Sequence, residues 1–137
     1  MSDQLTIDLV NRMIEEIQNN KKIELVDEIF AVSFVNHSPP PNVSGDRAGM
    51  RHLFAMVHTG CPDGRIVVKD QISDGHKVWT RKIFTGTHTG DFAGVGPTGK
   101  VITYEVVDIL AVEKGKITEH WSVVDRFELF QQLGLKR

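Results

Sequence analysis

The sequence predicts an α+β domain in which helices pack on one side of an antiparallel sheet. Up to Gly60, apolar side chains recur about every 3.6 residues, as on one side of a helix, and after Pro62 the period becomes two, as in a strand. The dipeptide Asp74-Gly75 separates two of the strand-like segments and is typical of a hairpin turn. Helices followed by a run of strands with short connections favour an α+β arrangement over alternating βαβ units.

Length and composition indicate one soluble globular domain, residues 1–137. The chain has 137 residues, of which 25% are charged, and a formal net charge of −2. No basic block suggests nucleic-acid binding, and no apolar run approaches the roughly 20 residues of a membrane span. The N-terminal segment lacks the pattern of a signal peptide. Since the single cysteine, Cys61, excludes an internal disulfide, we expect a cytoplasmic protein.

Three helices are expected before Pro62. The first has apolar residues at helical spacing over Ile7–Ile17, and the second is shorter, with its apolar side in Leu25–Phe30. A run of three prolines then forces an extended segment. Asp46 is the expected N-cap of the third helix, which carries Phe54 on its apolar side and ends at Gly60.

Four strands and a short helix are expected in the rest of the chain. The strands are Arg65–Ser73, His76–Thr87, Thr98–Glu113 and Lys116–Asp125, and the helix ends at Leu133. Both faces of the third of these strands are largely apolar, which is typical of a strand covered on both sides. A second subunit is the simplest cover for the outer face, so we expect a homodimer packed through the sheet.

Two motifs with possible chemistry are set aside. The segment Gly94–Lys100 fits the phosphate-loop pattern GxxxxGK, but Val101 stands where Ser or Thr is needed and a strand follows instead of a helix. This segment is therefore expected to be a glycine-rich connection between strands. The six histidines show no spacing typical of a metal site, and we expect neither a metal nor an organic cofactor.

A carboxylate at a strand end is the first candidate for chemistry. Asp125 shares the parity of Trp121 on the fourth strand, and a lone charge among apolar side chains is costly. Asp125 either caps the helix that begins near Arg126, or lies in an apolar cavity where it can exchange protons with a ligand.

Neighbouring strands offer companions for this carboxylate. If the strand faces that carry Trp79 with Arg81, and Tyr104 with Asp108, point into the same cavity, they line it together with Trp121 and Asp125. The alternative is an Arg81–Asp108 ion pair that only satisfies itself. Asn36 and His37 precede the prolines, where a loop can fold over the cavity mouth, although His37 can equally be a surface residue.

Several segments together resemble a known family. They are Phe34–Pro39, Arg81 with Gly86–Gly90, Pro97–Lys100, Gly115–Trp121, Asp125 and Gln132–Gly134. In this order they are similar to the SnoaL-like polyketide cyclases, also described as ester cyclase-like, of the NTF2-like superfamily. The resemblance implies a cone-shaped, curved antiparallel sheet packed on three N-terminal helices, with a pocket and a dimer through the sheet.

The resemblance also implies a reaction. In characterised cyclases of the family, the residue matching Asp125 is the acid/base of an intramolecular aldol ring closure without metal or cofactor, and the residue matching Asn36 lies in the pocket. Our hypothesis is that Asp125 removes a proton next to a carbonyl of a small hydrophobic ligand, while Asn36, His37 or Arg81 holds the enolate oxygen. The expected substrate-binding residues are Trp79, Arg81, Tyr104, Asp108, Trp121 and Phe54.

Two other classes stay open at this point. One is a different small-molecule enzyme on the same fold, such as an isomerase or an epoxide hydrolase in which Arg81, Asp108 and Asp125 meet. The other is a non-catalytic binding module. An apolar cavity with a buried carboxylate favours proton transfer, whereas a cavity filled by the protein's own side chains favours neither reaction.

Overall fold

The computed structural model describes residues 3–135 and confirms the α+β class. Its helical segments are α1 (Asp3–Arg12), the π-helix η1 (Met13–Asn19), the 3-10 helix η2 (Ile23–Leu25), α2 (Val26–Ile29), α3 (Arg47–Gly60) and α4 (Arg126–Leu133). Its strands are β1 (Phe30–Asn36), β2 (Arg65–Ser73), β3 (Lys77–Thr87), β4 (Val101–Glu113) and β5 (Lys116–Val124). No helix within residues 3–135 is both long and apolar enough to cross a membrane.

The strands form one sheet in the order β1-β5-β4-β3-β2. Strands β2 to β5 are the predicted antiparallel meander. The sheet is not entirely antiparallel, however, because β1 adds to it in parallel beside β5, with Asn36 opposite His120. This strand was not predicted, since its pairing partner lies far away in the sequence and periodicity reports only local structure.

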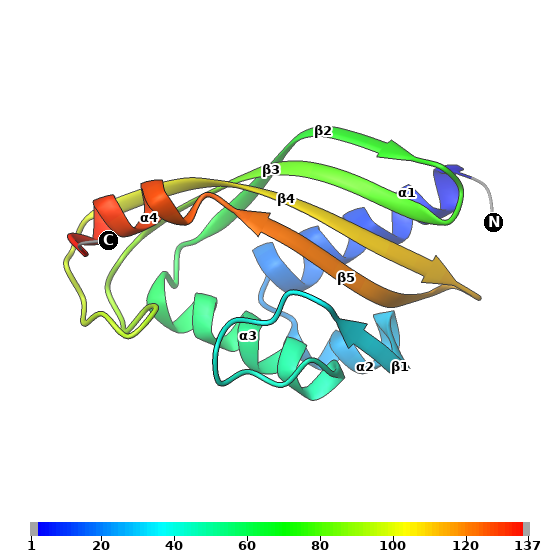
Figure 1. Cartoon of the computed structure of the whole chain (residues 1–137), viewed down its shortest axis with the longest axis horizontal. Helices are drawn as coiled ribbons and strands as arrows, with labels where there is room; N and C mark the ends of the chain where they lie inside the picture. Colours follow the sequence, from blue (N-terminus) through cyan, green and yellow to red (C-terminus); the bar gives the residue numbers. More distant parts are fainter. Residues whose placement is uncertain (1–2, 136–137) are drawn as a thin grey trace.

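The sheet arches over α1, η1 and α3, while α4 lies at the other end of the sheet from the start of α1 (Figure 1). Two separate groups of buried apolar side chains hold these layers together. The first joins η1, β1 and α3 through residues such as Met13, Phe34 and Phe54. The second joins β3, β4 and α4 through residues such as Phe84 and Leu129.

Local sequence signals account for several element boundaries. The Asp46 carboxylate accepts a hydrogen bond from the Gly49 amide at 2.8 Å and caps α3, as predicted. The predicted turn after β2 is also present, with the Asp74 carboxylate accepting from the Lys77 amide at 2.7 Å. Helix α4 ends at Leu133 and is followed by the C-cap Gly134, whose φ of 80° is a left-handed conformation that favours glycine.

The glycine-rich segment 94–100 connects β3 and β4, as predicted, and is held from within by His88. This imidazole is fully buried. Its Nδ1 accepts from the Thr98 amide at 3.3 Å, so the ring is read as the tautomer whose Nε2 donates to the Val95 carbonyl at 3.2 Å. The histidine thus binds backbone groups of the loop in addition to the loop's own backbone hydrogen bonds, such as those between Phe92 and Val95.

Candidate active site

A cavity of about 610 Å³ lies between the sheet and the helices, a volume in the range of small-molecule binding sites. Both apolar groups of the core contribute to its wall, the first through Met13, Met50 and Phe54, and the second through Phe84, Tyr104 and Leu129. Because the two groups do not fill the space where they meet, the domain keeps an apolar pocket.

Four polar side chains reach this pocket from three adjacent strands. Lys82 comes from β3, Asp108 from β4, and His120 and Ser122 from β5. Asp108 lies directly opposite Ser122 in the sheet. Since side chains two residues apart share one face of a strand, the pleat gathers all four on the concave side.

Lys82 and Asp108 form a buried ion pair. Lys82 Nζ is 2.6 Å from Asp108 Oδ2, and both side chains are only 3% exposed. Lys82 also donates to Gln18 Oε1 at 3.0 Å. Gln18 belongs to the π-helix η1, a helix form that is often found at functional sites.

The other carboxylate oxygen of the pair is unusual. Asp108 Oδ1 is buried and has no hydrogen-bond partner among residues 3–135. Leaving a buried acceptor unpaired costs about 1–3 kcal/mol, and more when it is charged. Because Asp108 lines the pocket, the simplest role for this oxygen is to accept a proton or a hydrogen bond from a ligand.

His120 is held in one tautomer by Asn36. Asn36 Oδ1 accepts from the Ser38 amide at 2.9 Å, which orients the carboxamide. His120 Nδ1 lies 2.8 Å from the same oxygen and must therefore carry the proton that it donates. The ring nitrogen left with a free lone pair is Nε2, for which no partner is found within residues 3–135.

Burial keeps His120 neutral. Desolvation lowers the pKa of His120 to about 4, against an opposing effect of the nearby Asp108 carboxylate and with smaller lowering effects of Lys82 and His37. At neutral pH the pocket therefore contains an imidazole that accepts hydrogen bonds through Nε2 rather than a cation.

Two further titratable groups stay protonated. Burial raises the pKa of the Tyr104 hydroxyl well above its ordinary value, so this pocket-lining group remains a hydrogen-bond donor. Burial, together with the charge of Asp63, raises the pKa of the Cys61 thiol to about 11. Cys61 is thus a buried thiol without the character of a nucleophile.

Three of the predicted ligand-binding residues line the pocket, namely Phe54, Tyr104 and Asp108. Three others do not, because Trp79, Arg81 and Trp121 lie on the convex outer face of the sheet. Trp79 and Trp121 are both paired with Ile109 of β4, next to Asp108 in sequence and so on the opposite face. The prediction placed the two tryptophans inside because it assumed that the strand faces that carry them point into the cavity.

A bulge contributed to the error on β5. Ile117 and Trp121 have the same parity, which would place them on one face of a regular strand, but the register between β4 and β5 shifts after Ala111. Ile117 is fully buried, whereas Trp121 lies on the outer side. There the Trp121 ring stacks on the His37 ring, with 4.6 Å between the ring centroids, and the Lys77 ammonium lies over the Trp121 ring.

Arg81 and Asp108 do not form the ion pair that was considered. Arg81 instead binds Asp70 at 2.7 Å and Glu105 at 3.1 Å on the outer face. The partner of Asp108 is Lys82, one residue later on β3. Since Arg81, Asp108 and Asp125 do not meet, the arrangement proposed for an epoxide hydrolase is absent from the described residues.

Asp125 takes the helix-cap role that was left open. Its exposed carboxylate accepts from the Glu128 amide at 3.1 Å at the start of α4, and it is not among the residues that line the pocket. Asn36 is buried and acts on the pocket through His120. His37 is exposed and contacts Glu119 at 3.0 Å, as expected for a surface residue.

The sequence interpretation missed Lys82, His120, Ser122 and Gln18. The sequence could have indicated the buried position of Lys82, because Lys82 shares the parity of Val78, Thr80 and Phe84. A cation on an otherwise apolar strand face needs a partner. No sequence pattern indicates the position of Gln18, because a π-helix shifts the helical phase in a way that a period of 3.6 does not predict.

The comparisons with known proteins agree with this geometry. Residues 8–133 match the SnoaL-like polyketide cyclase family. An aklanonic acid methyl ester cyclase of Streptomyces peucetius is 24% identical over 131 residues, which cover 93% of this chain and 90% of that protein. An enzyme of the same name from Streptomyces sp. strain C5 is also 24% identical, over 93% of this chain and 81% of its own length.

Solved structures show the same architecture. TsrD from Streptomyces laurentii superposes with a TM-score of 0.88 over 99% of both chains at 22% identity. IdmH from Streptomyces antibioticus gives a TM-score of 0.81 at 30% identity, covering 96% of this chain and 99% of its own. The fold is therefore the NTF2-like cone of these proteins, and the chain belongs to the SnoaL-like polyketide cyclase family.

Proposed function

We propose that the protein closes a ring by an aldol reaction within a small hydrophobic substrate that carries two carbonyl groups, such as a polyketide ester, with Asp108 as the base. The observation that carries this proposal is Asp108, a residue of the pocket lining whose buried carboxylate oxygen Oδ1 has no partner in the described chain. Family membership and the two cyclase relatives support the reaction class.

The proposed steps balance without a cofactor. Asp108 Oδ1 takes a proton from a carbon next to one carbonyl, and the electron pair of the C–H bond forms an enolate. The enolate carbon then attacks the second carbonyl, so that a C–C bond forms while the C=O π bond breaks. The resulting alkoxide takes back the proton from Asp108.

Two donors lie next to this base. The Lys82 ammonium binds Asp108 Oδ2 and Gln18, and its third N–H is available to an enolate oxygen. Ser122 lies opposite Asp108 on β5 and offers a hydroxyl. Donors that are already in place where negative charge develops usually supply the largest single part of the rate enhancement.

His120 would orient the substrate rather than remove the proton. With Nδ1–H donated to Asn36, the Nε2 lone pair accepts a hydrogen bond from a substrate hydroxyl. Its low pKa makes it a weaker base than a free imidazole. Asn36 is in this proposal a positioning residue.

The test compares the two candidate carboxylates. Aklanonic acid methyl ester and the free acid serve as first substrates, with ring closure followed by chromatography. Asp108→Asn should lower kcat by at least about a hundredfold. Asp125→Asn should leave kcat nearly unchanged, since Asn is also a favoured N-cap residue.

The opposite result would make Asp125 the base, as the family resemblance implied. Thermal unfolding of both variants, followed by circular dichroism, separates loss of chemistry from loss of fold. If both variants keep full activity on a substrate that the native protein converts, the pocket does not act through either carboxylate.

We also propose that the protein is a cytoplasmic homodimer that packs through the outer face of the sheet. This face carries apolar side chains that water reaches, among them Ile72 and Val123, which are 68% and 74% exposed. The half-buried Trp79 and Trp121 lie between them. A second copy of the chain would cover a surface of this kind.

A further inference from the structure

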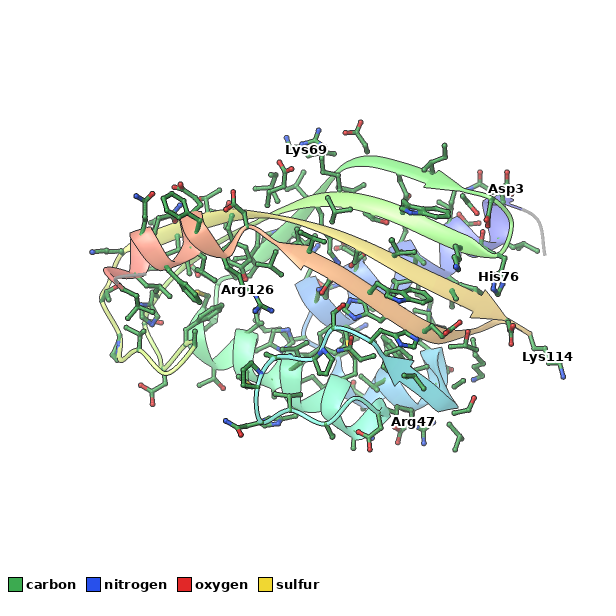
Figure 2. The ribbon with its side chains drawn as sticks, in the orientation of Figure 1. Asp3, Arg47, Lys69, His76, Lys114 and Arg126 are labelled. Carbon is green, nitrogen blue, oxygen red and sulfur yellow. The ribbon has the colours of Figure 1, made fainter. Side chains whose placement is uncertain are left out.

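Arg126 stands apart from the other arginines of the chain. It is the first residue of α4, it is exposed, and it lines the pocket. Each of the other described arginines has a carboxylate oxygen within 3.8 Å, namely Arg12, Arg47, Arg51, Arg65 and Arg81. Within residues 3–135 Arg126 has no such partner, and Figure 2 shows it at the start of α4, on the side toward α3.

The pocket has an uncompensated positive charge because of Arg126. The formally charged residues of its lining are Lys82, Asp108 and Arg126. The first two neutralise each other at 2.6 Å, and His120 is uncharged at neutral pH. The lining is therefore cationic in a chain whose formal net charge is −2, and a cationic pocket with apolar walls attracts an anion.

The position of Arg126 is also unfavourable for the helix itself. A cation in the first turn is repelled by the partial positive charge at the helix N-terminus. The carboxylates of Asp125 and Glu128 lie in the same turn, but neither forms an ion pair with Arg126. Asp125 accepts from the Glu128 amide, and Glu128 accepts from Gln132. An anion bound beside Arg126 would interact favourably with both the guanidinium and the helix end.

We propose that Arg126 binds a free carboxylate of the substrate at the pocket mouth, so that the substrate carries an acid group in addition to its reacting carbonyls. This inference rests on the proposed function in one respect, namely that the end of the substrate away from the carboxylate is the end that reacts at Asp108. A guanidinium is suited to a carboxylate because its planar donors bind both oxygens at once.

The sheet sets the length of such a substrate. Val124 lies two residues before Arg126 and is paired with Val106, which lies two residues from Asp108 on β4. Two residues of strand span about 7 Å, so the backbone positions of Asp108 and Val124 are about 7 Å apart along the strands. A fused aromatic acid spans that distance with the apolar walls around its rings.

The test is a binding measurement with a matched pair of probes, anthraquinone-2-carboxylate and its methyl ester, by isothermal titration calorimetry. The native protein should bind the carboxylate about tenfold more tightly than the ester, as expected for one charge-assisted contact. Arg126→Gln should remove this preference without changing the affinity for the ester, and Arg126→Lys should keep part of it. Arg65→Gln removes the same charge at an exposed site outside the pocket and should change neither affinity.

Three outcomes overturn the inference: equal affinity of the native protein for both probes, a preference that survives Arg126→Gln, or no binding of either probe. Failure of the proposed reaction would be seen separately. Asp108→Asn tests turnover, whereas the preference for the carboxylate depends on Arg126 and needs no turnover.

Discussion

The two faces of the sheet place similar charges in opposite surroundings. Arg81 and Lys82 are neighbours on β3, and each binds carboxylates. Arg81 lies on the outer face, 41% exposed in the single subunit, where water competes for both of its partners. Lys82 lies on the inner face, 3% exposed, with one carboxylate and one amide around it.

The difference shows why the function is assigned to the inner face. Exposed ion pairs are screened by water and contribute little to stability or specificity. A buried pair carries a large desolvation cost that its Coulomb attraction only partly offsets. The pair of Lys82 and Asp108 retains, in addition, an oxygen with no partner in the described residues, an arrangement that a purely structural pair would not need.

The largest change in the free energy of unfolding is expected when the buried cation, Lys82, is removed. Lys82→Met leaves Asp108 as a lone buried charge and should lower the free energy of unfolding by about 3–5 kcal/mol. Arg81→Met on the outer face should change it hardly at all. Urea denaturation followed by circular dichroism measures both values.

A double variant separates the charge from the packing. Lys82→Met combined with Asp108→Leu removes both charges and should restore stability to near that of the native protein, while activity stays lost. If Lys82→Met is no more destabilising than Arg81→Met, water reaches the inner pair and the contrast between the two faces does not hold.

The next effect concerns pH and the buried imidazole. His120 has a pKa of about 4 in the folded protein, compared with 6.5 for an unperturbed histidine. The unfolded chain therefore binds more protons between these values, and stability, fully present above pH 6.5, is lost as the pH falls toward 4. The loss should be about 3 kcal/mol.

The check is the free energy of unfolding measured across this pH range. His120→Gln keeps a donor for Asn36 and should flatten the pH dependence. His58→Gln is the control, since the half-buried His58 also has a lowered pKa and contributes a smaller slope of the same sign. An unchanged slope in His120→Gln would mean that His120 is accessible to protons in the folded state.

Much of the fold could be predicted because its signals are local. Periodicity located α3 and the four strands of the meander to within a few residues, and Asp46 and Asp74 marked a helix start and a turn. Strand β1 was missed because its partner, β5, is distant in sequence. No local pattern identifies the partner of a strand that lies so far along the chain.

The site was predicted less well because it depends on which face of each strand points inward. Asp108 and Tyr104 were assigned to a pocket and line it. Arg81 was assigned to the pocket instead of Lys82. The two residues are neighbours on the strand, but Arg81 is exposed on the outer face and Lys82 is buried on the inner face. A one-residue change of phase exchanges the inner and outer faces, and the register shift in β5 introduced such a change.

The smallest change in the stability of the subunit is expected from a substitution on the outer face of the sheet. Val123 and Val124 are consecutive, but Val123 is 74% exposed on the outer face and Val124 lines the pocket. Val123→Arg should leave the stability of the subunit nearly unchanged while it converts the proposed homodimer to a monomer, because a cation would be buried in the interface. Val32→Arg, at an exposed valine of the edge strand β1, should leave the dimer intact. Sedimentation velocity at micromolar concentration measures both, and a native protein that sediments as a monomer would contradict the proposed role of this face.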